Sequence, residues 1–220
     1  MDPDTPNFDS VARAYRWMEY ASFGPMLERC RFHFLPQSSA ARHALVLGDG
    51  DGRFTARLLA SNPTVQVDAV DASPAMLDIL RQRARNNCQN AETRLSTTQA
   101  DIRHFTPPGN DYDLVVSHFF LDCLTDEEVH ALVARICPSM TPDAIWLVSE
   151  FAVPPRGWKR VAARTLIRCL YFAFSVLTGL RIRHIPDYAK SLNDNGFHPV
   201  DRVAFLGGLL AAELWKPPSG

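Results

Sequence analysis

The 220-residue sequence has no apolar run long enough to span a membrane and no cysteine pattern typical of a metal or disulfide site. The longest apolar stretch, Cys169–Leu180, has 12 residues, whereas a spanning helix needs about 20. The five cysteines form no C-x-x-C pair, and an odd number cannot all pair within one chain. We therefore expect neither a membrane span nor a metal site. Because the cysteines show no disulfide pattern, we expect a protein of the reducing cytoplasm.

The sequence also has no surplus of basic residues, since it contains 23 Lys and Arg and 24 Asp and Glu. Nucleic-acid binding normally needs such a surplus on one face, so we expect no nucleic-acid partner. The charge is nevertheless uneven, since residues 151–184 contain seven Lys and Arg and no acid. This stretch is compatible with peripheral contact to an anionic membrane through residues 156–184. The alternative is a helix packed on the fold with a solvated basic face.

Strand-like and helical runs alternate along the chain. Strands are predicted at 44–47, 65–70, 94–99, 112–117, 144–151, 200–206 and 209–216, and helices at 54–60, 74–86 and 125–137. Ser73 and the pair Thr125 and Glu128 are typical helix caps. The alternation predicts a doubly wound, Rossmann-like α/β sheet of seven strands, mostly parallel. Because Gly207-Gly208 joins the last two strands, we expect them to form an antiparallel hairpin.

We expect one domain over residues 1–220, since domains usually run about 100 to 200 residues. Residues 1–36 carry apolar residues at helical spacing, broken by Gly24-Pro25, and predict an N-terminal helical cover. Residues 152–190 predict a helical insertion, because Trp158–Leu180 repeats apolar residues at the same spacing. Its aromatic residues suit a lid over an apolar substrate.

The loop after the first predicted strand reads Gly48-Asp49-Gly50-Asp51-Gly52. Ligands of open α/β sheets bind beyond the carboxyl ends of the strands, and glycines let bare backbone approach them. The spacing differs from the G-x-G-x-x-G of dinucleotide folds, which favours a ligand without phosphate. Asp71 ends the second strand, where a carboxylate can accept both ribose hydroxyls of an adenosine. The alternative is that Asp71 only caps the next helix, with Ser73 as a rival cap.

Taken with further segments, these features resemble the class I S-adenosylmethionine-dependent methyltransferases over residues 44–216. The segments are 44–52, 70–77, 100–102, 111–117 and the terminal hairpin. The resemblance implies S-adenosyl-L-methionine as cofactor, bound by Gly48, Asp49, Gly50, Gly52, Asp71, Ala72, Met76, Asp101, Ile102 and Ser117. Met76 would pack on the adenine, and Asp101 with Ile102 would read its edge. Family members commonly carry an acid at the position of Val46, so Asp49 or Asp51 would have to compensate here.

Transfer of a methyl group from a sulfonium depends mainly on aligning donor and acceptor, and a base is needed only for a protonated acceptor. His118, which the resemblance places near the methyl group, is the candidate base; the alternative is that it packs or caps. Asp122, a second catalytic candidate, and Glu150 lie near predicted strand tips. Their alternatives are a helix cap and a strand-end surface acid.

We therefore expect a methyltransferase acting on O, N or C of a small, largely apolar or aromatic acceptor. One rival interpretation is a cofactor-binding or regulatory protein that catalyses no reaction. It stays open because Val46 stands where the family commonly has an acid and because the sequence shows no obvious base. The other rival is a nicotinamide-dependent oxidoreductase, which the glycine spacing disfavours.

Overall fold

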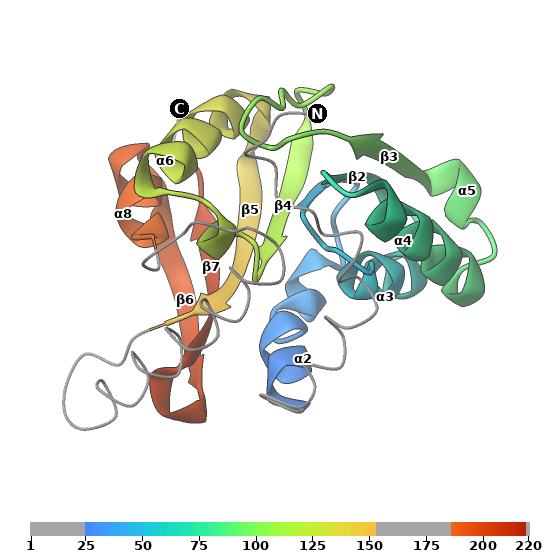
Figure 1. Ribbon diagram of the computed structural model, residues 1–220, viewed down its shortest axis with the longest axis horizontal. Coiled ribbons are helices and arrows are strands. Elements are labelled where there is room, and N and C mark those ends of the chain that lie inside the picture. The colour runs from blue at the N-terminus through green and yellow to red at the C-terminus, as the bar shows by residue number, and fades with distance from the viewer. Residues whose placement is uncertain (1–24, 153–185, 219–220) are drawn as a thin grey trace.

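The computed structural model describes residues 25–152 and 186–218, and its centre is a seven-stranded sheet (Figure 1). The spatial order of the strands is β3-β2-β1-β4-β5-β7-β6. The strands are β1 His43–Leu47, β2 Gln66–Asp71, β3 Leu95–Gln99, β4 Tyr112–His118, β5 Met140–Phe151, β6 His198–Phe205 and β7 Leu210–Lys216. The first five are parallel, and β7 pairs antiparallel with both β5 and β6. The predicted doubly wound sheet with an antiparallel C-terminal hairpin is confirmed.

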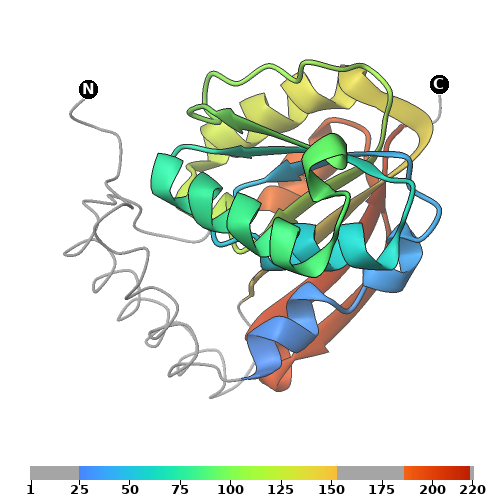
Figure 2. The ribbon, with the colours of Figure 1, turned by 90° about the vertical axis from the view of Figure 1, so that its right-hand side faces the viewer.

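Helices cover both faces of this sheet (Figure 2). The α-helices are α2 Pro25–Arg31, α3 Arg53–Ser61, α4 Pro74–Asn87, α5 Ala91–Arg94, α6 Asp126–Ile136 and α8 Tyr188–Asp194. The 3-10 turns are η1 Leu35–Ser38, η2 Leu121–Cys123, η3 Cys137–Ser139 and η4 Leu206–Gly208. Apolar residues of α2, α3 and α4 form one buried cluster with the sheet, and those of α6 and α8 form the other. The central strands are therefore apolar on both faces, as a covered parallel sheet requires.

The helix caps predicted from the sequence are present. Ser73 Oγ accepts a hydrogen bond from Met76 N at 3.2 Å at the start of α4. At α6, Thr125 Oγ1 accepts from Glu128 N, and the Glu128 carboxylate accepts from Thr125 N. These side chains satisfy N–H groups that have no partner within the first helical turn. The two helices accordingly begin where the sequence predicted.

Some boundaries differ from the predictions. β5 begins at Met140 rather than at Ala144, because an irregularity in its pairing with β4 absorbs the additional residues. The short helix α8 was not predicted; Asp187 caps it by accepting from Lys190 N at 2.9 Å. Most of the predicted N-terminal cover and of the insertion, residues 1–24 and 153–185, lies outside the described residues. None of the described helices is long and apolar enough to cross a membrane.

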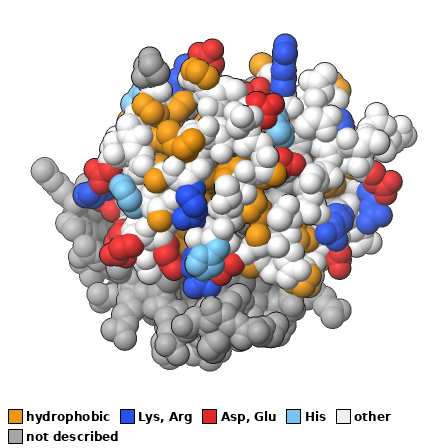
Figure 3. Space-filling view, turned by 90° about the horizontal axis from the view of Figure 1, so that it is seen from above, with side chains coloured by type: hydrophobic (Ala, Val, Ile, Leu, Met, Phe, Trp, Pro, Cys, Tyr) orange, Lys and Arg blue, Asp and Glu red, His pale blue; other side chains and the backbone are white. Residues whose placement is uncertain are grey.

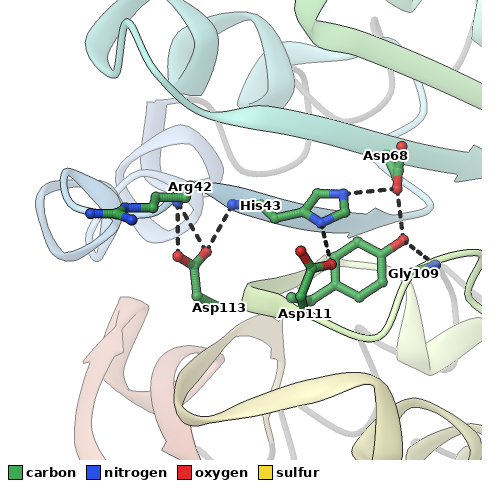
Figure 4. Close-up of polar contacts among 7 residues, drawn as sticks. Arg42, His43, Asp68, Gly109, Asp111 and Asp113 are labelled. Atoms are coloured by element: carbon green, nitrogen blue, oxygen red, sulfur yellow. Dashed lines mark hydrogen bonds and ion pairs between the residues drawn. The ribbon is translucent and has the colours of Figure 1, made fainter.

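A polar network joins the amino-terminal parts of β1, β2 and β4 (Figure 4). The His43 ring contacts Asp111 Oδ1 through Nδ1 at 2.7 Å and Asp68 Oδ2 through Nε2 at 3.1 Å. Tyr112 Oη donates to the same Asp68 oxygen at 2.6 Å. The Asp113 carboxylate accepts from His43 N at 3.0 Å. Since the glycine loop follows the carboxyl end of β1, this network stabilises the opposite end of the strands.

Candidate functional site

The loop Gly48–Gly52 connects the carboxyl end of β1 to α3 and lies between the ends of two neighbouring strands. β1 is flanked in the sheet by β2 and β4. The N–H of the first loop residue donates to Val70 O at 2.9 Å, which places Asp71, the last residue of β2, beside the loop. His118 ends β4 on the other side. Residues from three strand ends therefore meet here, as expected for a ligand site in this fold.

The three loop glycines all have positive φ, but their surroundings differ. A Cβ at Gly48 would lie 2.1 Å from Phe120 Cδ2, and a Cβ at Gly52 would lie 2.7 Å from Leu80 Cα in α4. A Cβ at Gly50 would meet no atom within 4 Å. Protein atoms therefore cover the loop backbone at Gly48 and Gly52, and the backbone is open to an approaching molecule at Gly50.

The two aspartates of the loop have different partners. The Asp49 carboxylate accepts from Thr55 N at 2.8 Å and so caps α3. Asp51 Oδ2 pairs with Arg53 at 3.2 Å and with Arg83 at 2.9 Å. Both carboxylates are thus engaged by groups of the chain, and which of them compensates for the acid that is missing at Val46 stays a prediction.

Arg31, at the end of α2, is a residue of this site that the sequence did not reveal. Its side chain is buried, and its guanidinium lies 5.5 Å from the centroid of the Phe119 ring. Burial raises the pKa of Asp49 to about 6, and the Arg31 guanidinium acts in the opposite direction. α2 also contains the exposed Arg29, and nothing in the sequence distinguishes these two arginines.

Asp71 carries a half-buried carboxylate at the end of β2. Its Oδ1 accepts from Ser73 N at 2.9 Å, and its main-chain oxygen accepts from Ala100 N at 3.1 Å, next to the end of β3. Ser73 caps α4. The alternative that Asp71 itself caps α4 is therefore wrong, and its role in binding a ribose stays a prediction.

The residues predicted to hold an adenine surround the ends of β2 and β3. Met76 and Ile102 are buried, and Ala72 is exposed. The Asp101 carboxylate is bound by the Arg103 guanidinium, with Nη2 at 2.6 Å from Oδ2, and these hydrogen bonds lower the pKa of Asp101. An ionised carboxylate only accepts hydrogen bonds, and this is the property needed to read an adenine amino group. No pattern in the sequence singles out Arg103.

Both residues predicted to lie near the methyl group are buried. Ser117 is fully buried, and its Oγ accepts from Trp146 Nε1 at 3.0 Å, so the hydroxyl is engaged in the core. The His118 ring stands edge-on to Phe54 with 4.6 Å between centroids. Neither of its ring nitrogens has a hydrogen-bond partner among the described residues. Burial, and after it Arg31, holds the pKa of His118 well below its usual range, so the ring is neutral and weakly basic.

Asp122 and Glu150 are two buried acids at the ends of β4 and β5. Their exposed fractions are 7% and 0%. Burial, and after it the nearby Asp122, raises the pKa of Glu150 well above its usual range. The alternative that Glu150 is a strand-end surface acid is wrong, because the turn after β4 covers this side chain and hydrogen-bonds to it. Asp122 lies in η2, and Thr125 rather than Asp122 caps α6.

The described surface offers neither a metal cluster nor an extended patch of one charge on the face in Figure 3. Among residues 25–152 and 186–218, no three His, Cys, Asp or Glu side chains are grouped so that they could hold a metal ion. On that face, seen from above, acidic and basic side chains are interspersed with apolar ones.

Comparison with known sequences identifies methyltransferase relatives. Residues 44–143 match the family model described as a methyltransferase domain. Trans-aconitate 2-methyltransferase of Rhodococcus jostii (strain RHA1) is 28% identical over 198 residues, which cover 88% of this chain and 66% of that protein. Malonyl-[acyl-carrier protein] O-methyltransferase of Paenibacillus sp. (strain JDR-2) is 35% identical over 74 residues, 34% of this chain and 26% of that protein. The aligned parts span less than two thirds of either relative.

Solved structures share the fold. The mitomycin 7-O-methyltransferase MmcR superposes with a TM-score of 0.69 at 17% identity, covering 96% of this chain and 60% of that one. The N-methyltransferase NodS from Bradyrhizobium japonicum WM9, in complex with S-adenosyl-L-homocysteine, superposes with a TM-score of 0.60 at 16% identity, covering 94% of this chain and 88% of that one. The seven-stranded architecture is therefore one that methyltransferases use.

Proposed function

We propose that this chain, which belongs to the class I S-adenosylmethionine-dependent methyltransferases, transfers a methyl group from that cofactor to a small, largely apolar acceptor. One observation carries the proposal: the glycine loop is open at Gly50, and Asp71, whose side chain is half-buried, ends the neighbouring strand beside the loop. Open main chain and a carboxylate at adjoining strand ends suit an adenosine whose sugar hydroxyls donate hydrogen bonds.

The described residues fit this cofactor in three respects. Asp71 would accept hydrogen bonds from the ribose, and the loop backbone at Gly50 leaves room for a ligand. Asp101, kept ionised by Arg103, would accept from the adenine amino group. The bound cofactor supplies a methyl group on a positively charged sulfur. The chain then contributes alignment of the acceptor and exclusion of water.

An apolar or aromatic acceptor is favoured by the side chains at the ends of β4 and β5. The rings of Phe119 and Phe151 lie there with 5.5 Å between centroids, and the Phe120 ring lies against the loop. Ligand sites of this kind combine apolar walls with a few polar groups. The insertion at 152–190, predicted to be a substrate lid, lies mostly outside the described residues and stays part of the proposal.

Proton removal has a minor place in the proposed mechanism. His118 is neutral and enclosed, so it would serve as a base only for an acidic acceptor such as a phenol. Asp122 is the second candidate for this role. We propose that most of the rate acceleration comes from alignment, whether the methylated atom is O, N or C.

Calorimetric binding of S-adenosylhomocysteine tests the donor site. Asp71→Ala removes the proposed ribose acceptor and is expected to weaken binding at least about tenfold, because hydrogen bonds to a charged group are lost. Asp78→Ala is the matched control. Asp78 is an exposed acid on α4 that pairs with Arg81, and its loss should leave the affinity unchanged. Equal affinities of wild type and Asp71→Ala would overturn the assignment of Asp71.

A second candidate function is binding of the cofactor without transfer. Val46 in place of an acid and the enclosed His118 favour it. Incubation with labelled donor and a panel of lipophilic acceptors separates the two functions. Label on an acceptor would contradict the binding protein, whereas donor binding without transfer to any acceptor would support it.

A further inference from the structure

The turn that follows β4 has a strained backbone and is held by the end of β5. Phe119 adopts φ 53°, a left-handed conformation that side chains other than glycine rarely adopt. Three successive N–H groups of the turn are bonded to β5. Phe119 N donates to Ser149 O at 2.7 Å, and Phe120 N and Leu121 N donate to Glu150 Oε1 at 3.0 and 2.7 Å. The strained turn therefore depends on the position of Glu150.

The same turn determines what lies against the glycine loop. Phe120 follows the strained residue, and its ring packs so closely on Gly48 that a Cβ there would lie 2.1 Å from the ring. Because the loop is open at Gly50, a ligand of the loop would have this ring as a neighbouring wall. Glu150 is fully buried, so water cannot replace its carboxyl group as acceptor for the two N–H groups.

We propose that Glu150 is a positioning residue of the donor site: its carboxyl group fixes the turn after β4 so that the Phe120 ring forms one wall of the glycine loop. The inference rests on the proposed function for the identity of the ligand. The contact between position 120 and Gly48 is independent of any ligand, so it can be tested separately.

Binding of S-adenosylhomocysteine tests the effect on the site. Glu150→Leu removes both acceptor oxygens at similar size and is expected to weaken binding about tenfold or more. Glu150→Gln keeps one acceptor oxygen, and a neutral amide suits a group whose pKa is raised, so binding should stay within about threefold. Phe120→Ala removes the wall and should also weaken binding. Unchanged or tighter binding by Phe120→Ala or by Glu150→Leu would overturn the proposal.

Glu213 provides the matched control for a buried glutamate. It lies on β7, is 4% exposed and bonds Trp215 Nε1 at 2.9 Å and Arg202 Nε at 2.8 Å. Glu213→Leu should lower the melting temperature but leave the affinity at the wild-type value. Equal losses of affinity in Glu213→Leu and Glu150→Leu would show a general loss of folding and contradict a positioning role.

A ligand-free double-mutant cycle separates this inference from the proposed function. Gly48→Ala should lower the melting temperature because its Cβ meets the Phe120 ring, and Phe120→Ala should restore part of the loss. If Glu150 holds the ring in place, Gly48→Ala should cost less in a Glu150→Leu background. The same cost in both backgrounds would overturn the inference, even if wild type bound no S-adenosylhomocysteine and the proposed function had failed.

Discussion

Asp49 combines a helix cap with a titration that should be visible in protein stability. Its pKa is raised from 3.8 to about 6, so the folded chain binds this proton more tightly than the unfolded chain. The stabilisation from this group is therefore complete below about pH 4 and is lost as the pH rises through about 6.

Asp49→Asn removes this titration and keeps an oxygen that can cap α3. Relative to this variant, the free energy of unfolding of wild type should fall by about 1–3 kcal/mol between about pH 4 and about pH 7. Urea unfolding at the two pH values measures the difference, and taking it relative to the variant cancels the other titrating groups. A difference that does not change with pH would contradict the raised pKa.

Single residues also show where sequence interpretation succeeds. The position of Asp71 at the end of β2 could be predicted because it follows a predicted strand and precedes a helix with its own cap, Ser73. Arg31 could not be located, because its burial depends on how α2 packs near Asp49 and Phe119, both distant in the sequence. Local patterns indicate where a side chain lies along an element, whereas its burial depends on what packs over it.

At the scale of elements, the network around His43 should contribute to stability without affecting the candidate site. Tyr112→Phe removes the hydroxyl that donates to Asp68 and accepts from Gly109 N at 3.3 Å. The free energy of unfolding should fall by about 1–2 kcal/mol, because the remaining groups lose a partner. Affinity for S-adenosylhomocysteine should not change, since the network lies at the opposite end of β1. A change in affinity would show that the two ends are coupled.

Helices and strands were predicted correctly where a short segment of sequence defines their ends, and less well where a neighbouring strand defines them. α4 and α6 begin at caps that are visible in the sequence, and the Gly207-Gly208 hairpin follows from turn chemistry. The start of β5 was missed because pairing with β4 continues past Ala144 to Met140. Strand ends depend on whether a neighbour continues to accept hydrogen bonds, and the sequence of one strand does not contain that information.

For the molecule as a whole, the uneven distribution of charge predicts contact with an anionic membrane. Residues 151–184 hold seven of the 23 Lys and Arg and none of the 24 acids. We expect the full chain to co-sediment with vesicles containing anionic lipid at low salt and to be released as salt rises, since exposed charges are screened. Neutral vesicles are the control. Absence of binding at low salt would favour the alternative of a solvated basic face.

The amino-acid sequence was sufficient to predict the alternation of strands and helices, the caps, the terminal hairpin, the glycine loop and the aspartate after the second strand. Each of these follows from residues close together in the chain, where periodicity and turn chemistry act. The folded structure was needed to show that Phe120 covers Gly48, that Glu150 is buried and bonded to the turn after β4, and that β7 lies between β5 and β6. These features depend on packing between distant segments, which local spacing does not specify.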